Sequence, residues 1–82
     1  MTILAHVEMT DTFGREPNYA WVQRHTLRFP DGTPTVSIVK RAKRELSMQR
    51  VPCQRLEYGD TIELRPKGWA RVIFIEITNA QI

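Results

Sequence analysis

The residue types that build metal centres and disulfides are scarce in this sequence. It has one cysteine, Cys53, and two histidines, His6 and His25, among 82 residues. A single cysteine forms no internal disulfide, which is typical of a protein in a reducing compartment. These three residues are scattered, without the close spacing of zinc ligands, so we expect no metal site and no bound cofactor.

Long apolar runs are also absent. No run approaches the roughly 18 residues of a membrane-spanning helix. The first residues (MTILAH) lack the basic segment and long apolar segment of a signal peptide. We therefore expect a cytoplasmic protein that does not enter a membrane.

No residue pattern typical of an enzyme is found. Gly14, Gly32, Gly59 and Gly68 stand singly, as turn glycines rather than as a loop that cradles phosphate. Cys53 has no neighbouring base to activate its thiol, and no pair of carboxylates suggests acid–base catalysis. A domain this small has little room for a pocket of the usual few hundred Å3. We predict that the protein is not an enzyme.

What is present fits one small globular domain over residues 1–82. Hydrophobic residues make up 41% of the chain and charged residues 26%. A chain of this length buries roughly 60–65% of its unfolded surface, which is enough for one modest core. No repeat, linker or low-complexity segment divides it.

Two alternating segments, residues 2–13 and 18–29, predict an N-terminal β-hairpin. One register places Ile3 opposite Phe29 and Glu8 opposite Arg24, which separates apolar from charged residues. A shift by one residue would mix them, so we predict the first register. We expect the second strand to place its aromatic face in the core, under a helix. That face consists of Tyr19, Trp21, Leu27 and Phe29.

Residues 34–48 predict that helix. Thr33 is a natural N-cap, and Pro34 suits the first turn. At about 100° per residue, apolar side chains share one narrow arc and basic side chains fan across the opposite side. The apolar arc consists of Ile38, Val39, Ala42 and Leu46. The basic side consists of Lys40, Arg41, Lys43 and Arg44.

The basic charge is concentrated in this region. Residues 34–50 carry a net charge of +4, and the rest of the chain carries −1. Such a run is commonly the solvated face of a helix. Its alternative is nucleic-acid binding by Lys40, Arg41, Lys43 and Arg44, with the sheet arginines contributing.

The last third of the chain predicts strands. Val51 and Cys53 suit a short edge strand, because Pro52 between them donates no ladder hydrogen bond. Residues 61–65 alternate, residues 66–68 turn, and residues 71–77 form a near-continuous apolar run that is typical of a central strand. The predicted element order is ββα(β)ββ.

We therefore predict an α+β domain in which an N-terminal hairpin, one helix and a C-terminal hairpin form one unit. The helix packs on one face of a mostly antiparallel sheet. The element order resembles that of the β-grasp, ubiquitin-like fold, which implies a central last strand parallel to the first. A plain antiparallel four-stranded sheet with one helix is the alternative. The chain lacks a Gly-Gly tail, so conjugation and sulfur transfer are not expected.

A sheet covered by one helix leaves its second face open to a partner or to a second copy of the chain. Val22, Arg24 and Arg28 lie on that predicted face, and we take them as candidate protein-binding residues. Trp69, in the last hairpin turn, is a fourth candidate, because interface hot spots are rich in Trp. Its alternative role is a lid over one end of the core.

Three short motifs resemble those of a group of small, uncharacterised proteins encoded by bacteriophages and prophages. They are TDTFG at residues 10–14, NYAWV at 18–22 followed by Arg24, and YGD at 58–60. The resemblance implies a phage origin and a bacterial host cytoplasm, and it assigns no catalytic or binding residue. We predict a non-enzymatic accessory protein that acts through protein–protein interaction with a host or phage protein. A homodimer and a nucleic-acid-binding module are the other predictions that the sequence allows.

Overall fold

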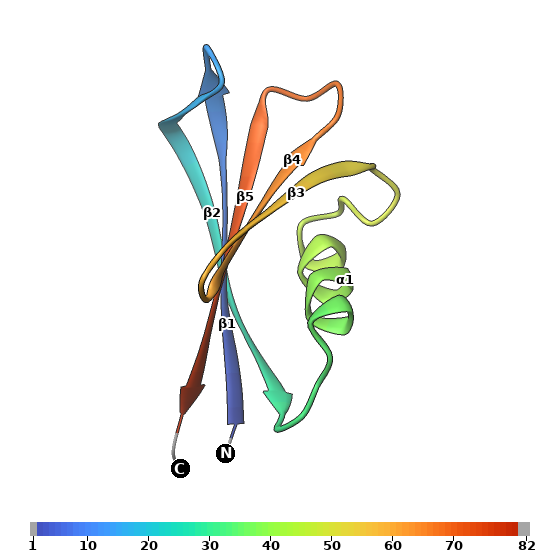
Figure 1. The fold of residues 1–82 in the computed structure, drawn as a ribbon. Coiled ribbons are helices and arrows are strands. Elements are labelled where there is room, and N and C mark those ends of the chain that lie inside the picture. The colour runs from blue at the N-terminus through green and yellow to red at the C-terminus, as the bar shows by residue number, and fades with distance from the viewer. Residues whose placement is uncertain (1, 81–82) are drawn as a thin grey trace.

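The computed structural model describes residues 2–80, which form one α+β domain, as predicted (Figure 1). Every predicted strand is present, and the single helix follows the N-terminal hairpin. The short third strand includes Cys53 as predicted, but it begins there, so Val51 lies just before it. The elements are β1 (Thr2–Phe13), β2 (Glu16–Pro30), α1 (Thr35–Glu45), β3 (Cys53–Tyr58), β4 (Thr61–Pro66) and β5 (Arg71–Ala80).

All five strands belong to one antiparallel sheet in the order β2-β1-β5-β4-β3. The last strand is central, as the β-grasp resemblance implied, but it runs antiparallel to β1 instead of parallel. The antiparallel direction of β5 follows from the presence of β3 between α1 and β4 in the sequence. Helix α1 returns the chain so that β3 runs in the direction of β2, and two hairpin turns then give β5 that same direction, opposite to β1.

The predicted register of the first hairpin is confirmed over most of its length. Ile3 faces Phe29 and Glu8 faces Arg24. The Arg24 Nε atom donates to Glu8 Oε2 at 3.1 Å across the open face of the sheet. Since both side chains are partly solvated, this pair stabilises the hairpin by a fraction of a kcal/mol, about 0.2–1.

The register shifts near the turn, between Thr10 and Thr12. There Phe13 faces Glu16, whereas the unshifted register would have placed it opposite Tyr19. Hydrogen bonds to Asp11 stabilise this register shift. Its Oδ1 atom accepts from the Ala20 amide at 3.0 Å, and its Oδ2 atom accepts from the Asn18 side chain at 2.9 Å. Tyr19, between these two donors, has a φ of 55°. A carboxylate that captures backbone and side-chain donors competes here with the regular ladder.

Replacing Asn18 with Ala is expected to raise the pKa of Asp11. That pKa lies below its ordinary value, first because of the Asn18 side-chain hydrogen bond and then because of the Ala20 amide. A lowered pKa in the folded state means that this carboxylate stabilises the fold above its ordinary pKa of 3.8 and loses that effect as the pH falls through the folded-state value. An NMR titration of the Asp11 carboxyl carbon in both proteins measures the change, and an identical titration would contradict it.

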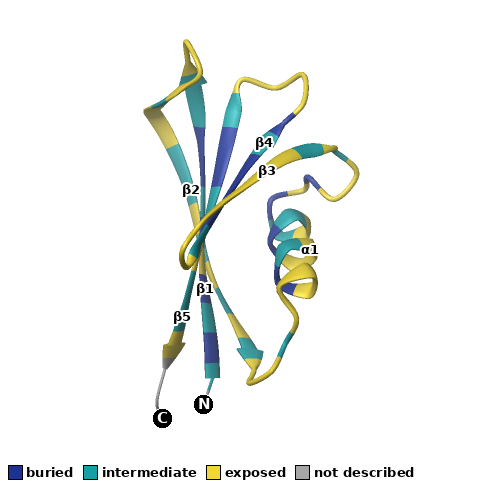
Figure 2. Cartoon of the chain, viewed as in Figure 1, coloured by how far each residue is buried: buried dark blue, intermediate teal, exposed yellow. Residues whose placement is uncertain are grey.

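The core lies between α1 and one face of the sheet (Figure 2). Its strand residues come from β1, β5 and β4, where every second side chain faces the helix. The helix contributes Ile38 and Ala42, and the chain just after it adds Leu46 and Met48. The remaining buried members are Ile3, Ala5, Val7, Met9, Ile62, Leu64, Ile73 and Ile75.

The helix begins one residue later than the sequence predicts and ends at Glu45, three residues before the predicted end. Pro34, not Thr33, occupies the N-cap position, and no side chain caps the helix there. The Thr33 hydroxyl instead donates to the Pro30 carbonyl at 2.6 Å, which closes the turn between β2 and α1. The apolar arc of the helix faces the core as predicted, with Val39 at its margin.

Tyr19 and Trp21 are not in the core, contrary to prediction. They are 53% and 39% exposed, whereas Leu27 and Phe29 pack against the core. The 11 residues of α1 span about 16 Å, but the 15 residues of β2 extend about 50 Å. The helix therefore covers only the later part of β2 (Figure 1), and Trp21 lies beyond that cover. Tyr19, with its φ of 55° near the register shift, instead lines a cleft on the other face of the sheet.

Candidate functional site

Two hairpin turns lie together at the end of the sheet that α1 leaves uncovered (Figure 1). One joins β1 to β2 and the other joins β4 to β5. The Thr12 amide donates to the Ala70 carbonyl at 2.9 Å and so links the two hairpins. We call the surface that they form the hairpin-tip site, and it comprises Arg15, Trp21, Arg65, Lys67, Trp69 and Arg71.

At the centre of this site, the Arg71 guanidinium lies between two indole rings. Its Cζ atom is 5.2 Å from the centre of the Trp21 ring and 4.7 Å from that of Trp69. Each cation–π contact at a partly exposed position contributes about 0.5–1 kcal/mol. Contact with both rings restricts the motion of the guanidinium, although Trp69 and Trp21 keep 48% and 39% of their surface exposed.

Arg65 joins the β4–β5 hairpin to the turn between β1 and β2. Its Nε atom donates to Glu63 Oε2 at 2.6 Å, and its Nη1 atom donates to the Arg15 carbonyl at 2.8 Å. The Glu63 side chain is only 9% exposed, so loss of this partner would leave a largely buried carboxylate unpaired. Arg65 therefore holds the β1–β2 turn against β4.

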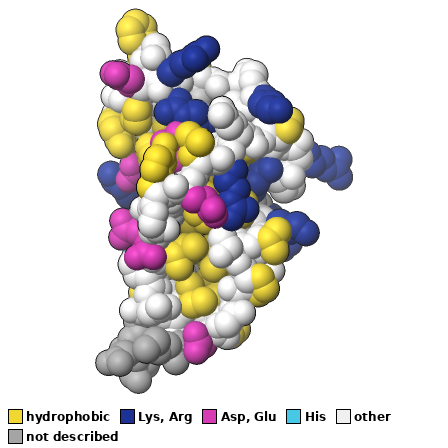
Figure 3. Space-filling model, in the orientation of Figure 1, with side chains coloured by type: hydrophobic (Ala, Val, Ile, Leu, Met, Phe, Trp, Pro, Cys, Tyr) yellow, Lys and Arg dark blue, Asp and Glu magenta, His cyan; other side chains and the backbone are white. Residues whose placement is uncertain are grey.

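A cleft of about 830 Å3 opens beside these contacts, contrary to the expectation that so small a domain has little room for a pocket of a few hundred Å3. Four cationic residues line it, namely Arg15, Arg65, Lys67 and Arg71, and no carboxylate is among the described residues that do so. Trp69 forms part of the wall. In Figure 3 basic side chains of the visible face lie near the two hairpin turns at its top and also extend down to the level of α1.

Cys53 also lines this cleft. Its Sγ atom donates to the Val51 carbonyl at 3.4 Å. Burial raises the pKa of the thiol, and the positive charge of Lys43 lowers it by a smaller amount. The net effect favours the thiol over the thiolate, which is the nucleophilic form.

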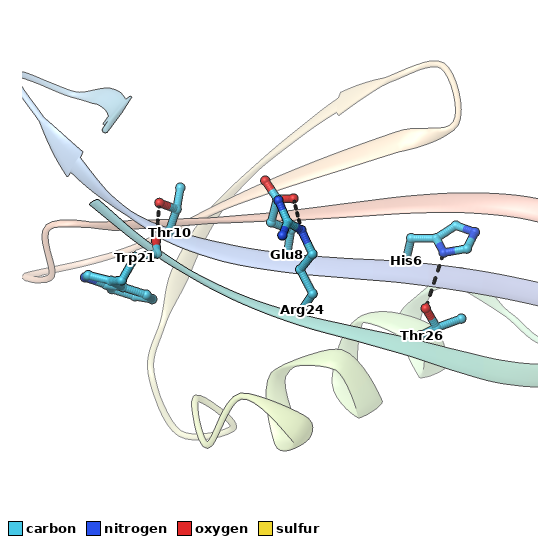
Figure 4. A network of polar contacts seen from close by, with 6 residues as sticks. All are labelled: His6, Glu8, Thr10, Trp21, Arg24 and Thr26. Carbon is cyan, nitrogen blue, oxygen red and sulfur yellow. Dashed lines mark hydrogen bonds and ion pairs between the residues drawn. The ribbon is translucent and has the colours of Figure 1, made fainter. Parts of the chain in front are cut away.

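The open face of the sheet carries a second cleft, of about 420 Å3. Arg24 lines it together with Glu8, His6 and Tyr19. Figure 4 shows the polar contacts that cross from β1 to β2 here: the Glu8–Arg24 ion pair, and His6 beside Thr26 at 3.5 Å. The carboxylate of Glu8 therefore engages the arginine that the sequence singled out.

The four predicted protein-binding residues do not form one cluster. Val22, Arg24 and Arg28 lie on the open face, where they pair with Thr10, Glu8 and Leu4 of β1. Trp69 belongs to the hairpin-tip site, and its neighbours are Arg71 and, across that guanidinium, Trp21. Sequence reasoning identified Trp69 but missed Arg71, because Trp69 lies in the turn before β5 and the alternation of a strand does not relate the two side chains.

The four predicted nucleic-acid-binding residues lie on α1 as expected, but two have partners within the chain. The Arg41 Nε atom lies 3.1 Å from Glu45 Oε1, and Lys43 Nζ donates to the Val51 carbonyl at 2.7 Å. Lys40 and Arg44 are exposed and form no ion pair with another described residue. The helix lies on the opposite face of the sheet from Arg24 and Arg28, so the two basic sets are apart.

The chain has no match among protein-family models, curated proteins or solved structures. Within residues 2–80, no group of three or more His, Cys, Asp or Glu side chains is placed to hold a metal ion. No helix in that part of the chain has the length and apolarity to cross a membrane. The hairpin-tip site is therefore characterised by its geometry alone, which is that of a cationic cleft with a preordered Trp–Arg–Trp stack.

Proposed function

We propose that this is a non-enzymatic accessory protein of phage type, which acts in the bacterial cytoplasm by binding another protein. The hairpin-tip site is its binding surface, and the partner, a host or phage protein, presents acidic residues. The observation that carries this proposal is the Arg71 guanidinium held between Trp21 and Trp69 at the wall of a cleft lined by cations.

The composition of the site supports binding of a protein. Trp and Arg are the residues most enriched at the energetic centres of protein interfaces. Because the two rings already fix the Arg71 side chain, less side-chain entropy is lost when it pairs with a carboxylate of the partner. The Arg65 side chain is likewise held in place, by its hydrogen bonds to Glu63 and to the Arg15 carbonyl. The cations of the cleft favour an acidic partner, and they speed its approach.

The motifs that resemble phage proteins contribute directly to this surface. The segment at residues 10–14 supplies Asp11 and the segment at 18–22 supplies Asn18 and Trp21. The hydrogen bonds of Asp11 to Asn18 and Ala20 set the local path of β2 just before Trp21. The resemblance is therefore to the residues that shape this end of the sheet.

Replacing Arg71 with Ala is expected to weaken binding of the partner by about 30-fold, which corresponds to the loss of about 2 kcal/mol at an interface hot spot. The immobilised protein is used to capture partners from nuclease-treated bacterial lysate, and the affinity for a stoichiometric partner is then measured with purified protein. Trp69→Ala is expected to act in the same direction.

Two control variants match these changes in residue type. Arg28→Ala removes an exposed arginine from the open face, and Tyr58→Ala removes an aromatic side chain that is 57% exposed at the far turn. Neither is expected to alter the affinity by more than about twofold, as for surface residues outside an interface core. A partner that binds the Arg71→Ala variant as tightly as the original chain, or capture of no stoichiometric partner, would contradict the proposal.

Nucleic-acid binding is the second candidate function. It is favoured by the four cations of the cleft and the exposed faces of the Trp rings, on which bases stack in single-strand binding proteins. Fluorescence anisotropy with single-stranded DNA and RNA at two salt concentrations tests it. Arg65 is already paired with Glu63, so neutralisation of three phosphates would give a slope of about −2 in the logarithmic salt plot for a single strand. The double variant Lys40→Gln/Arg44→Gln separates a contribution of α1 from that of the hairpin-tip site, and no binding at low salt removes this candidate.

A further inference from the structure

Strand β3 forms one edge of the sheet and is open along its outer side. Within residues 2–80 its only strand neighbour is β4. Residues 54–58 are all exposed. An open edge of this kind exposes backbone donors and acceptors that pair readily with another strand.

The hydrogen bonding of β3 with β4 shows which backbone groups point outward. The Lys67 amide donates to the Pro52 carbonyl at 2.9 Å, in line with the β3–β4 register. In an antiparallel pair, alternate residues direct their N–H and C=O groups toward the same neighbour. Gln54, Leu56 and Tyr58 therefore face β4. The N–H and C=O groups of Arg55 and Glu57 point away from the sheet.

We infer that two copies of this chain join through β3, in an antiparallel arrangement with two-fold symmetry centred on Leu56. In that register Arg55 of each copy lies opposite Glu57 of the other, and both residues turn their outward backbone groups to the second copy. Two such pairs supply about four backbone hydrogen bonds and two cross-strand ion pairs. The sheets of the two copies become one continuous sheet.

The neighbouring two-fold registers, with the axis on Arg55 or on Glu57, are excluded because they oppose like charges. With the axis on Arg55, two guanidinium groups lie directly opposite each other, and with the axis on Glu57 two carboxylates do so. Like charges in direct opposition destabilise a strand pair. Within one chain, Arg55 Nη2 and Glu57 Oε1 are already 2.6 Å apart, so both side chains lie on one face of β3. In the dimer, this face carries a compact group of four alternating charges.

In this register the side chains on the other face of β3 also lie opposite compatible side chains of the second copy. Leu56 lies opposite Leu56 and Gln54 lies opposite Tyr58. Leu56 is 36% exposed and Tyr58 is 57% exposed in the single chain, so pairing brings together apolar surface that is solvated in the monomer. This dimer is argued from the edge of β3 and does not rest on the proposed binding of an acidic partner, although Gln54 and Leu56 also line the cleft of the hairpin-tip site.

Sedimentation velocity over micromolar to millimolar protein concentrations tests the dimer. The original chain is expected to dimerise, whereas Arg55→Glu and Glu57→Arg are each expected to weaken the dimer by at least about tenfold, because each opposes like charges. The double variant Arg55→Glu/Glu57→Arg restores the opposition of unlike charges and is expected to dimerise as the original chain does. An equal mixture of the two single variants is expected to form a heterodimer.

A cross-linking experiment checks the register without a change of charge. In a Cys53→Ser background, Leu56→Cys places one thiol from each copy on the two-fold axis. Directly opposite positions without backbone hydrogen bonds have Cα atoms about 4.5 Å apart, within the range of a disulfide. Gln54→Cys in the same background is the matched control, since its counterpart in the second copy is far away, and it should not cross-link.

Three results would overturn the inference. They are a monomer at every concentration, single charge reversals that dimerise like the original chain, and a disulfide that forms as readily from Gln54→Cys as from Leu56→Cys. The first would mean that Arg55 and Glu57 only protect the edge from aggregation. The second would mean that self-association occurs elsewhere, such as through the edge strand β2. Arg28→Glu, on β2, is the control for that case, and it is expected to leave a dimer through β3 unchanged.

Discussion

Replacing Ile73 with Ala is expected to lower the free energy of unfolding by about 3–4 kcal/mol, within the range for truncation of a large side chain in a packed core. Ile73 is 0% exposed on the central strand β5, where it pairs with Met9 on one side and with Leu64 on the other. No neighbour is free to fill the space that its side chain leaves. Domains of this size have total stabilities near the lower end of about 5–15 kcal/mol, so a large fraction of the variant should be unfolded at moderate urea concentrations.

Urea denaturation followed by circular dichroism measures this effect. Ile77→Ala, on the same face of the same strand, is the matched control and should cost about half as much, because Ile77 is only half-buried at the margin of the core. A loss below about 1 kcal/mol for Ile73→Ala would contradict the assignment of β5 to the centre of the core.

Replacing Arg65 with Met is expected to destabilise the fold by about 2 kcal/mol. The change removes the partner of the Glu63 carboxylate and the hydrogen bond to the Arg15 carbonyl. Breaking a fully buried ion pair costs about 3–5 kcal/mol. The Arg65 side chain is 30% exposed, so water compensates Glu63 in part and the expected cost is smaller.

The double variant Glu63→Gln/Arg65→Met separates the lost charge pairing from the lost side-chain packing. It is expected to regain at least about 1 kcal/mol relative to Arg65→Met, because no buried carboxylate is then left without a partner. Arg41→Met, which breaks the exposed pair with Glu45, should cost about 0.5 kcal/mol or less. If Arg65→Met and Arg41→Met were equally mild, Arg65 would not hold the two hairpins together.

The long strands, the helix and the register could be predicted because they follow from the separation of apolar and charged side chains. Ile3 opposite Phe29 and Glu8 opposite Arg24 satisfy that separation at once, and a shifted register does not. The apolar run in β5 likewise indicated a central strand, which is its position in the sheet.

The path of the hairpin near its turn could not be predicted in this way. Alternation assumes a regular ladder, but Asp11 accepts hydrogen bonds from Asn18 and Ala20 and so shifts the pairing. The exposure of Trp21 also depends on how far α1 reaches along the sheet, which is a property of two elements together. For the same reason the sequence suggested Trp69 as a single anchor, and only the arrangement of three strands shows that Arg71 lies between Trp69 and Trp21.

The pairing of β1 with β5 has a consequence for the timing of folding. Thr2 lies opposite Ala80 and Asp11 lies opposite Arg71, so the middle of the sheet joins segments from opposite ends of the sequence. On the ribosome, β1 and β2 emerge first and can pair only as an isolated hairpin, which is marginally stable in water, and the inner edge of β1 stays open until β5 has been made. Such long-range pairing slows folding to the millisecond-to-second range that is typical of sheets with non-local contacts. The nascent hairpin therefore carries an exposed apolar face during most of its synthesis, and this is the interval in which it is most prone to aggregate.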